Sequence, residues 1–193
     1  MERRTCVAFA VGVVLVALGF SGLSPGAEAS QVPLTILHTN DVHSHYQADK
    51  GPMGLGGIGR LATEIRRQRA QAQNSLLLDG GDWSEGNIYY NLDAGRTSLE
   101  IMNELGYDAA VIGNHDWLSG PDQMLKLFTQ VKPTFPILGA NLDLAKYPRA
   151  AEFSKYVTPY QILNVGGIKV AVVGIVTYEL IYDRYFAPVD IKD

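Results

Sequence analysis

Short apolar runs of strand length alternate along this sequence with segments that have helical periodicity. Five such runs lie at residues 34–38, 75–78, 109–112, 135–138 and 168–176. The last run is almost continuous in apolar residues, as is typical of a strand buried on both faces. Strands that alternate with helices predict an α/β layered fold. No other feature of the sequence limits the fold as strongly.

Three segments between the apolar runs have the pattern of helices. Apolar residues recur at helical spacing over Ile58–Ile65, and charged residues occupy the opposite side. Thr97 and Glu100 have the spacing of a capping box, which predicts a helix that ends at Leu105. Pro121 suits the first turn of a third helix, because its fixed φ is already helical.

The first 29 residues have the three parts of a secretory signal peptide. Arg3 and Arg4 form a basic start, an apolar run extends from Cys6 to Phe20, and Ala27-Glu28-Ala29 is a typical cleavage site. A membrane-spanning helix needs about 20 apolar residues, so this run is short for an anchor. We therefore expect a signal peptide at residues 1–29, an exported protein that is periplasmic or secreted, and no stable membrane span after cleavage.

The remaining residues, 30–193, have a length typical of one domain, and no repeat or linker interrupts them. Cys6 is the only cysteine in the sequence and lies in the expected signal peptide, so no disulfide is expected. A net charge of −4 without basic runs gives no reason to expect a nucleic-acid polymer as partner. A small anionic substrate would need local positive charge, which bound metal can supply.

Polar residues of the metal-ligand type follow each of the first three apolar runs. Asp41 and His43 follow the first, Asp82 follows the second, and Asn114 and His115 follow the third. In open α/β sheets, ligands bind outside the carboxyl ends of the strands, so we expect these side chains at one edge. An isolated Gly-Asp after a strand is ordinary turn chemistry. Three clusters in chain order, each at a strand end, strongly indicate a metal site.

Glycines accompany two of these clusters. We expect Gly81 and Gly113 to let the backbone turn sharply, so that the side chains of Asp82 and Asn114 face the crevice. The glycines within residues 54–59 follow no strand and have the wrong spacing for a dinucleotide site. Helix entry and close packing explain that second group better.

Together these motifs resemble the signature of the calcineurin-like metallophosphoesterases, and the surrounding sequence resembles their 5′-nucleotidase branch. The resemblance covers most of residues 34–177 and includes Ile36–Ser44, Gly56–Leu61, Leu76–Asp82 and Pro136–Asn141. It implies a hydrolase that cleaves phosphate esters of nucleotides by two-metal in-line attack, with two divalent ions such as Mn, Zn, Co or Fe. The implied fold is a layered β-sandwich flanked by helices, of which this chain would hold the N-terminal half.

The same resemblance implies a role for each residue of the expected site. Asp41 and His43 would bind the first metal, and Asp82 would bridge both metals. Asn114 would bind the second metal through its amide oxygen. His115 would be the catalytic residue that stabilises the transferring phosphoryl group, with protonation of the leaving oxygen as a further role.

The sequence departs from this family in two respects. Family members complete the site with two later histidines, whereas no histidine follows His115 here. We therefore expect the domain at 30–193 to be truncated at its C-terminal side, to lack the later metal ligands and the nucleotide-reading domain, and to be inactive by itself. Family members also place an aspartate where this chain has Leu118, and that aspartate orients the catalytic histidine. Asp116 and Glu85 are the candidates for that orienting role here.

Two alternative functions remain open. A sulfur-compound hydrolase is one, because thiosulfate-cleaving relatives share the two-metal domain, and an inactive truncated form is the other. Four residues near the motifs are expected to serve other purposes. His45 is expected at the rim of the site, His38 as a hydrogen-bonded histidine of the core, and Trp83 and Trp117 as packing for the loops.

Overall fold

The structure is a computed structural model that describes residues 31–177 and 183–192, so the expected signal peptide at 1–29 lies outside the described residues. From Val32 onward the chain forms one compact unit. Within the described ranges, no helix has the length and apolar character needed to cross a membrane.

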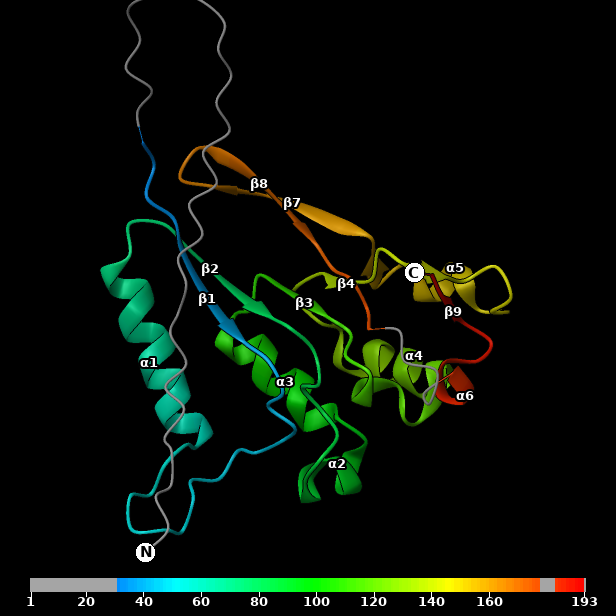
Figure 1. The fold of residues 1–193 in the computed structure, drawn as a ribbon, viewed down its shortest axis with the longest axis horizontal. Coiled ribbons are helices and arrows are strands. Elements are labelled where there is room, and N and C mark those ends of the chain that lie inside the picture. Colours follow the sequence, from blue (N-terminus) through cyan, green and yellow to red (C-terminus); the bar gives the residue numbers. More distant parts are fainter. Residues whose placement is uncertain (1–30, 178–182, 193) are drawn as a thin grey trace, which may run out of the picture. The chain divides into compact units, whose positions relative to one another are not determined.

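Five parallel strands form the main sheet, in the spatial order β1-β2-β3-β4-β6 (Figure 1). Their bounds are β1 Thr35–Thr39, β2 Ser75–Asp79, β3 Ala109–Val111, β4 Ile137–Leu138 and β6 Val157–Thr158. Four of the five predicted runs therefore form strands of one sheet. The expected α/β class is confirmed.

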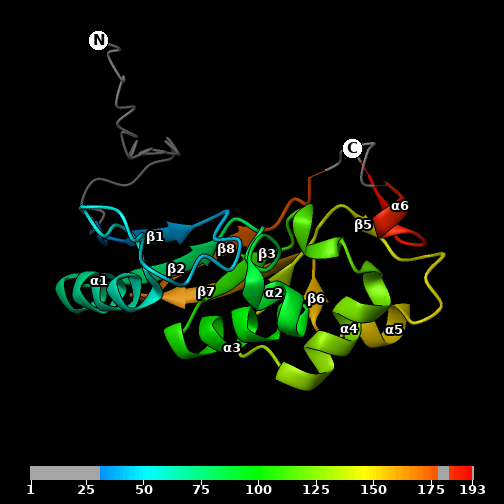
Figure 2. The same cartoon turned by 90° about the horizontal axis from the view of Figure 1, so that it is seen from below.

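Helices cover one face of this sheet (Figure 2). Because the strands follow one another across the sheet in chain order, crossovers of one hand bring successive helices to the same side. The helices are α1 Ile58–Gln71, α2 Ile88–Asp93, α3 Arg96–Leu105, α4 Gly120–Val131, α5 Ala150–Phe153 and α6 Asp183–Phe186, with a 3₁₀ turn, η1, at His115–Trp117.

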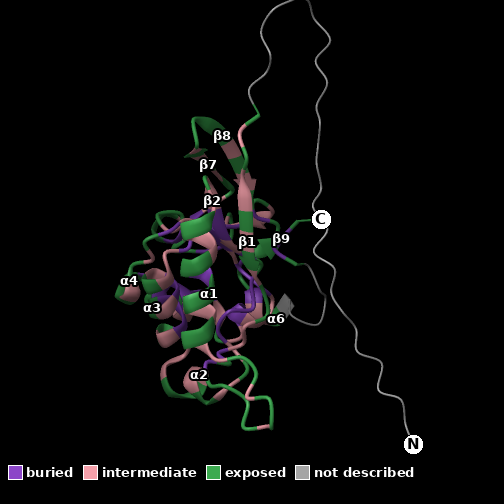
Figure 3. Ribbon diagram, turned by 90° about the vertical axis from the view of Figure 1, so that its left-hand side faces the viewer, coloured by how far each residue is buried: buried purple, intermediate pink, exposed green. Residues whose placement is uncertain are grey.

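The hydrophobic core lies between the sheet and the helices (Figure 3). Leu77 and Ile137 contribute from the strands, whereas Leu99, Leu125 and Phe128 contribute from α3 and α4, and all five are fully buried. Burial of one side chain of this size stabilises the folded state by about 1.5–3 kcal/mol. The core thus fixes the strands whose ends carry the polar clusters.

The start of α3 differs from the prediction. The capping box at Thr97 is wrong, because the helix begins at Arg96 after Gly95, which has a positive φ of 97°. Thr97 instead donates from its N–H and its hydroxyl to Asp93 Oδ2, at 3.0 and 2.5 Å. Asp93 therefore satisfies an amide of the first turn that the capping box would have served. The predicted helix end at Leu105 is confirmed.

The last apolar run forms one strand of an exposed hairpin. β7 (Tyr160–Val165) pairs antiparallel with β8 (Ile168–Val173) outside the five-stranded sheet. Val173 is 57% exposed, so the expectation of a strand buried on both faces is wrong. A third, two-stranded sheet joins β5 (Leu142–Asp143) to β9 (Asp190–Ile191).

Within the described residues, strand β1 is exposed on the face of the parallel sheet opposite the helices. Ile36 of β1 is 55% exposed, and His38, two residues further on the same strand face, is also exposed. The expectation that His38 belongs to the core is therefore wrong. A hollow of about 480 Å³ lies over this face, and its lining includes Leu78, Val111 and Val172. Of the expected layered fold, the described residues supply one parallel sheet with helices on one face, together with the hairpin β7–β8.

Candidate metal centre

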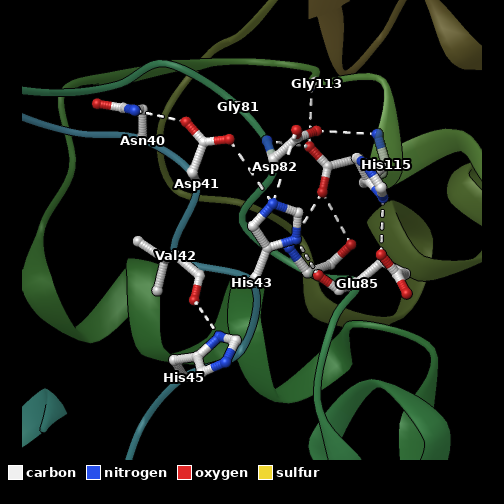
Figure 4. A network of polar contacts seen from close by, with 12 residues as sticks. Asn40, Asp41, Val42, His43, His45, Gly81, Asp82, Glu85, Gly113 and His115 are labelled. Carbon is white, nitrogen blue, oxygen red and sulfur yellow. Dashed lines mark hydrogen bonds and ion pairs between the residues drawn. The ribbon is translucent and has the colours of Figure 1, made fainter.

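Three loops bring the predicted polar residues together at the carboxyl edge of the sheet (Figure 4). We call them the β1 loop (residues 40–45), the β2 loop (80–86) and the β3 loop (112–116). The β1 and β2 loops are joined by a hydrogen bond from the His43 N–H to the Asp82 carbonyl, at 2.9 Å. The strand order predicted this meeting of the loops, because parallel strands end at one edge.

Three of the four predicted metal ligands have left-handed backbone conformations. The φ angles are 54° at Asp41, 47° at His43 and 56° at Asp82. Such a conformation costs a residue other than glycine of the order of 1–3 kcal/mol and persists only where its surroundings fix it. Strain of this kind collects at ligand and active sites, which supports a functional role for these loops.

The two glycines beside the ligands serve different purposes. Gly81 has a positive φ of 99°, which bears out the predicted sharp turn before Asp82. Gly113 is needed for close approach instead, because a Cβ atom there would lie 2.1 Å from Asp82 Oδ1. The β2 and β3 loops therefore pack backbone against backbone, which brings Asp82 against the residues that follow Gly113.

The side chains of Asp41, His43 and Asp82 form a group of metal-ligand type. His43 Nε2 lies 3.6 Å from Asp41 Oδ1 and 3.8 Å from Asp82 Oδ2. His43 Nδ1 is hydrogen-bonded to the carbonyl oxygen of Glu85, so Nδ1 carries the proton and Nε2 presents its lone pair to the two carboxylates. One imidazole nitrogen and two carboxylate oxygens are ligands that suit a divalent transition metal.

The charge around this group also fits a cation. Burial raises the pKa of Asp79, at the end of β2, to about 6, against hydrogen bonds from Thr39 and Gly81 that lower it. The charges of Asp41 and Asp82 raise it further. Negative charge is therefore concentrated at this edge, and a bound divalent ion would offset it.

Asp82 lies between the first ligand group and the β3 loop. Its Oδ1 accepts a hydrogen bond from the His115 backbone N–H at 2.8 Å, while Oδ2 faces His43. Asn114, which directly precedes His115, is half-buried in the same loop. The carboxylate of Asp82 thus contacts both the β1 loop and the loop that carries the remaining predicted ligand.

Glu85 holds the ring of His115. His115 Nδ1 lies 2.7 Å from Glu85 Oε2, and its ring meets that of His43 edge to face, with 5.0 Å between centroids. His43, Glu85 and His115 also offer ligand atoms that lie within 4.8 Å of one another. The described residues therefore contain two overlapping groups of ligand type that share His43.

Asp116, the other acid considered as a partner of His115, has a different position. It is buried, and its oxygens accept hydrogen bonds from the N–H groups of Asp82, Ser84 and Gly113 and from the Ser84 hydroxyl, at 2.8–3.0 Å. Burial raises the pKa of Asp116 to about 8, although the hydrogen bonds from Gly113 and Ser84 oppose this rise. Asp116 therefore fastens the β2 loop to the β3 loop.

Sequence reasoning missed two polar contacts of the β1 loop. Asn40 donates from Nδ2 to Asp41 Oδ2 at 2.5 Å, and the buried hydroxyl of Ser44 donates to the Ser84 carbonyl. Both residues lie inside the Asp-x-His motif region, but nothing in their spacing indicates where their side chains point. His45 is exposed, with Nδ1 3.2 Å from the Val42 carbonyl, which is consistent with the rim position expected for it.

The two tryptophans next to the motif acids belong to the core. Trp83 and Trp117 are buried, and the ring of Trp117 stacks on that of Phe153 with 5.8 Å between centroids. The expectation that they pack the loops is confirmed.

Comparisons with known proteins bear on this geometry. The sequence profile of a family described as calcineurin-like phosphoesterase matches residues 34–183. A snake venom 5′-nucleotidase from Naja atra is 44% identical over 154 residues, which cover 76% of this chain and 28% of that protein. The residues of this chain thus correspond to less than a third of that relative.

Solved structures of two nucleotidases are also similar to this chain, which again covers less than a third of each. A 5′-nucleotidase precursor from Thermus thermophilus has a TM-score of 0.67 and 32% identity, over 75% of this chain and 28% of its own. The NAD nucleotidase of Haemophilus influenzae has a TM-score of 0.71 and 27% identity, over 83% of this chain and 29% of its own.

Proposed function

This chain belongs to the calcineurin-like phosphoesterase family, and from that premise we propose that its carboxyl-edge site is part of a two-metal centre that hydrolyses phosphate esters of nucleotides. The observation that carries the proposal is the group formed by Asp41, His43 and Asp82, with His43 Nε2 facing both carboxylates. The similar proteins named above are nucleotidases, which favours a nucleotide over a sulfur compound as substrate.

Four residues of this chain would hold the metals. Asp41 and His43 would bind one divalent ion, Asp82 would bridge to a second, and Asn114 would bind the second through its amide oxygen. When bound, such ions stabilise the charge of the phosphoryl oxygens and lower the pKa of the attacking water. Mixed oxygen and nitrogen ligands suit Mn, Zn, Co or Fe.

His115 is the residue that this chain itself contributes to the chemistry. Its backbone is held by Asp82 and its Nδ1 by Glu85, so the ring stands beside the ligand group in a fixed orientation. Nδ1–H donates a hydrogen bond to Glu85, so in the imidazolium form the second proton is on Nε2, which would interact with the phosphate and transfer that proton to the leaving oxygen. General acid catalysis of this kind contributes about 10²–10⁴ to a rate.

The site needs ligands beyond those of this chain. The sequence contains four histidines, and none follows His115, so the later imidazoles that the family places on the second ion are not among these residues. We use "full-length form" for a protein that joins this chain to those later histidines. We propose that the full-length form is the active enzyme and that the 193-residue chain alone has no comparable turnover.

We also propose that the protein is exported to the periplasm or secreted. Support comes from the basic start, the apolar run Cys6–Phe20 and the Ala27-Glu28-Ala29 site. The venom origin of one similar protein agrees with export. Sequencing of the exported protein should give Ser30 as the first residue. The proposal would be contradicted if the protein stayed inside the cell and still had Met1 as its first residue.

The metal requirement is the direct test of the proposed activity. The full-length form should release phosphate from a 5′-nucleotide, lose that activity in excess chelator and regain it with Mn²⁺ or Zn²⁺. Thiosulfate should be cleaved at less than a tenth of that rate. Full activity in excess chelator would contradict the two-metal mechanism, and faster cleavage of thiosulfate would favour the sulfur-compound hydrolase. Activity of the 193-residue chain within tenfold of the full-length form would overturn the need for later ligands.

A further inference from the structure

We propose that Glu85 is the positioning residue of His115 and takes the role that an aspartate at the position of Leu118 has in related proteins. The inference rests on the proposed function, because it concerns the residue assigned there to the chemistry. Its structural basis is the 2.7 Å contact between Glu85 Oε2 and His115 Nδ1. The two partners are 30 residues apart in the sequence, and the fold brings the β2 and β3 loops together.

The contact determines which ring nitrogen carries the proton. A carboxylate only accepts hydrogen bonds, so Nδ1 of His115 donates and the proton of the neutral ring stays on that atom. The side chains of His115 and Glu85 are 32% and 29% exposed, so the pair stands at the surface of the site rather than inside the core. Glu85 thus fixes the ring orientation and keeps one proton on Nδ1, so the proton that the imidazolium form would transfer to the leaving oxygen is the one on Nε2.

The other acid near His115 is not available for this role. Both carboxylate oxygens of Asp116 accept hydrogen bonds from the β2 and β3 loops, namely from Asp82, Ser84 and Gly113. Asp116 is buried, whereas the ring of His115 is partly exposed. Asp116 therefore holds the β2 and β3 loops together, and Glu85 holds the imidazole of His115.

Glu85 contacts both histidines of the site, but through different atoms. Its side chain holds His115, whereas its backbone carbonyl accepts from His43 Nδ1. A Cβ atom on the next residue, Gly86, would lie 2.8 Å from the His43 Cβ, so glycine there lets the β2 loop pass close to the ring. A side-chain substitution at Glu85 should therefore release His115 while the acceptor for His43 stays in place.

A competing assignment is that Glu85 binds metal together with His43 and His115, since their ligand atoms lie within 4.8 Å of one another. The hydrogen bonds favour positioning. The Nδ1 atoms of both histidines already face Glu85, and His43 Nε2 faces Asp41 and Asp82. Metal content separates the two assignments, because a lost ligand lowers it and a lost positioning contact does not.

The kinetic experiment uses the full-length form with a saturating 5′-nucleotide. Glu85→Ala should lower kcat about 10–100-fold, the range for loss of an orienting partner, with KM and metal content nearly unchanged. Glu85→Gln should recover most of the rate, because its amide oxygen still accepts from Nδ1. Glu104→Ala, at an exposed glutamate of α3, is the matched control and should remain within about twofold of the unaltered protein.

A second variant tests the role of position 118. Leu118 follows His115 by one turn of the 3₁₀ segment, where side chains three apart eclipse each other. Leu118→Asp in the Glu85→Ala background should therefore restore part of the lost rate. Loss of metal in Glu85→Ala, or an unchanged kcat, would overturn the proposal.

A measurement without turnover makes the result independent of the proposed function. In the 193-residue chain, ring ¹⁵N chemical shifts of neutral His115 should report the Nδ1–H tautomer, and Glu85→Ala should shift it toward the other tautomer. The shifts of His43 should stay unchanged, because its acceptor is the Glu85 backbone. An unchanged His115 tautomer would overturn the proposal. A full-length form without nucleotidase activity would refute the function but leave this test in force.

Discussion

The two halves of the site are held by different means. In the β1 half, residues 40–45, the Asp41 side chain is 61% exposed and accepts a hydrogen bond from the neighbouring Asn40. In the β2–β3 half, the Asp82 side chain is 11% exposed, and buried Asp116 fastens both loops. The fold itself therefore preorganises the β2–β3 half. The backbone of the β1 half is tied to the β2 loop by the His43 N–H, so the proposed cation would mainly fix the exposed Asp41 side chain.

The largest expected effect concerns the same chemical change made in each half. Asp116→Asn places an amide N–H₂ against buried N–H donors, and each donor left without an acceptor costs about 1–3 kcal/mol. In metal-free protein, it should lower the free energy of unfolding by about 2–4 kcal/mol. Asp41→Asn, at an exposed side chain, should change it by less than about 0.5 kcal/mol.

Denaturant titration of both variants measures this difference. Equal losses at the two positions would mean that the two halves are equally preorganised, which would contradict the comparison. A loss at Asp41→Asn larger than at Asp116→Asn would reverse it.

A smaller effect should appear in the pH dependence of stability. Burial raises the pKa of Asp79 to about 6, above its ordinary value of 3.8. Between pH 4 and 6 the folded state therefore binds more protons than the unfolded state, so the contribution of this group to stability falls as pH rises. In metal-free protein, the stability of the unaltered chain relative to Asp79→Asn should fall by up to about 3 kcal/mol over this range.

Unfolding curves at several pH values in chelator measure that difference. The difference in stability between the unaltered chain and Asp79→Asn should be constant above the raised pKa of Asp79, where the carboxyl is ionised in both the folded and the unfolded state. A difference that rises with pH would show that the hydrogen bonds from Thr39 and Gly81 outweigh burial.

The sequence predicted the edge at which the site forms, because each polar cluster directly follows a strand of the parallel sheet. It did not predict which acid holds His115. Asp116 is adjacent in sequence, but the 3₁₀ turn directs its side chain into the core, while Glu85 reaches the ring from another loop. Contacts between loops depend on tertiary packing, which local spacing does not encode.

Two predictions of burial were wrong because burial depends on which layers of the fold cover a strand. The run 168–176 is apolar enough for a buried strand, yet β8 lies in an exposed hairpin, and His38 is exposed among the described residues. Gly166-Gly167, both with positive φ, was the available hairpin signal. Apolarity alone does not reveal which face of a strand another layer covers.

The most direct test of the central claim compares His115→Ala with Asp82→Ala in the full-length form. Bound metal is measured by elemental analysis, and phosphate release from a 5′-nucleotide is measured at saturation. His115→Ala should keep its metal and lose about 10²–10⁴ in kcat, whereas Asp82→Ala should lose metal and activity together. If His115→Ala loses metal as completely as Asp82→Ala, His115 is a ligand, and the assignment of this site is contradicted.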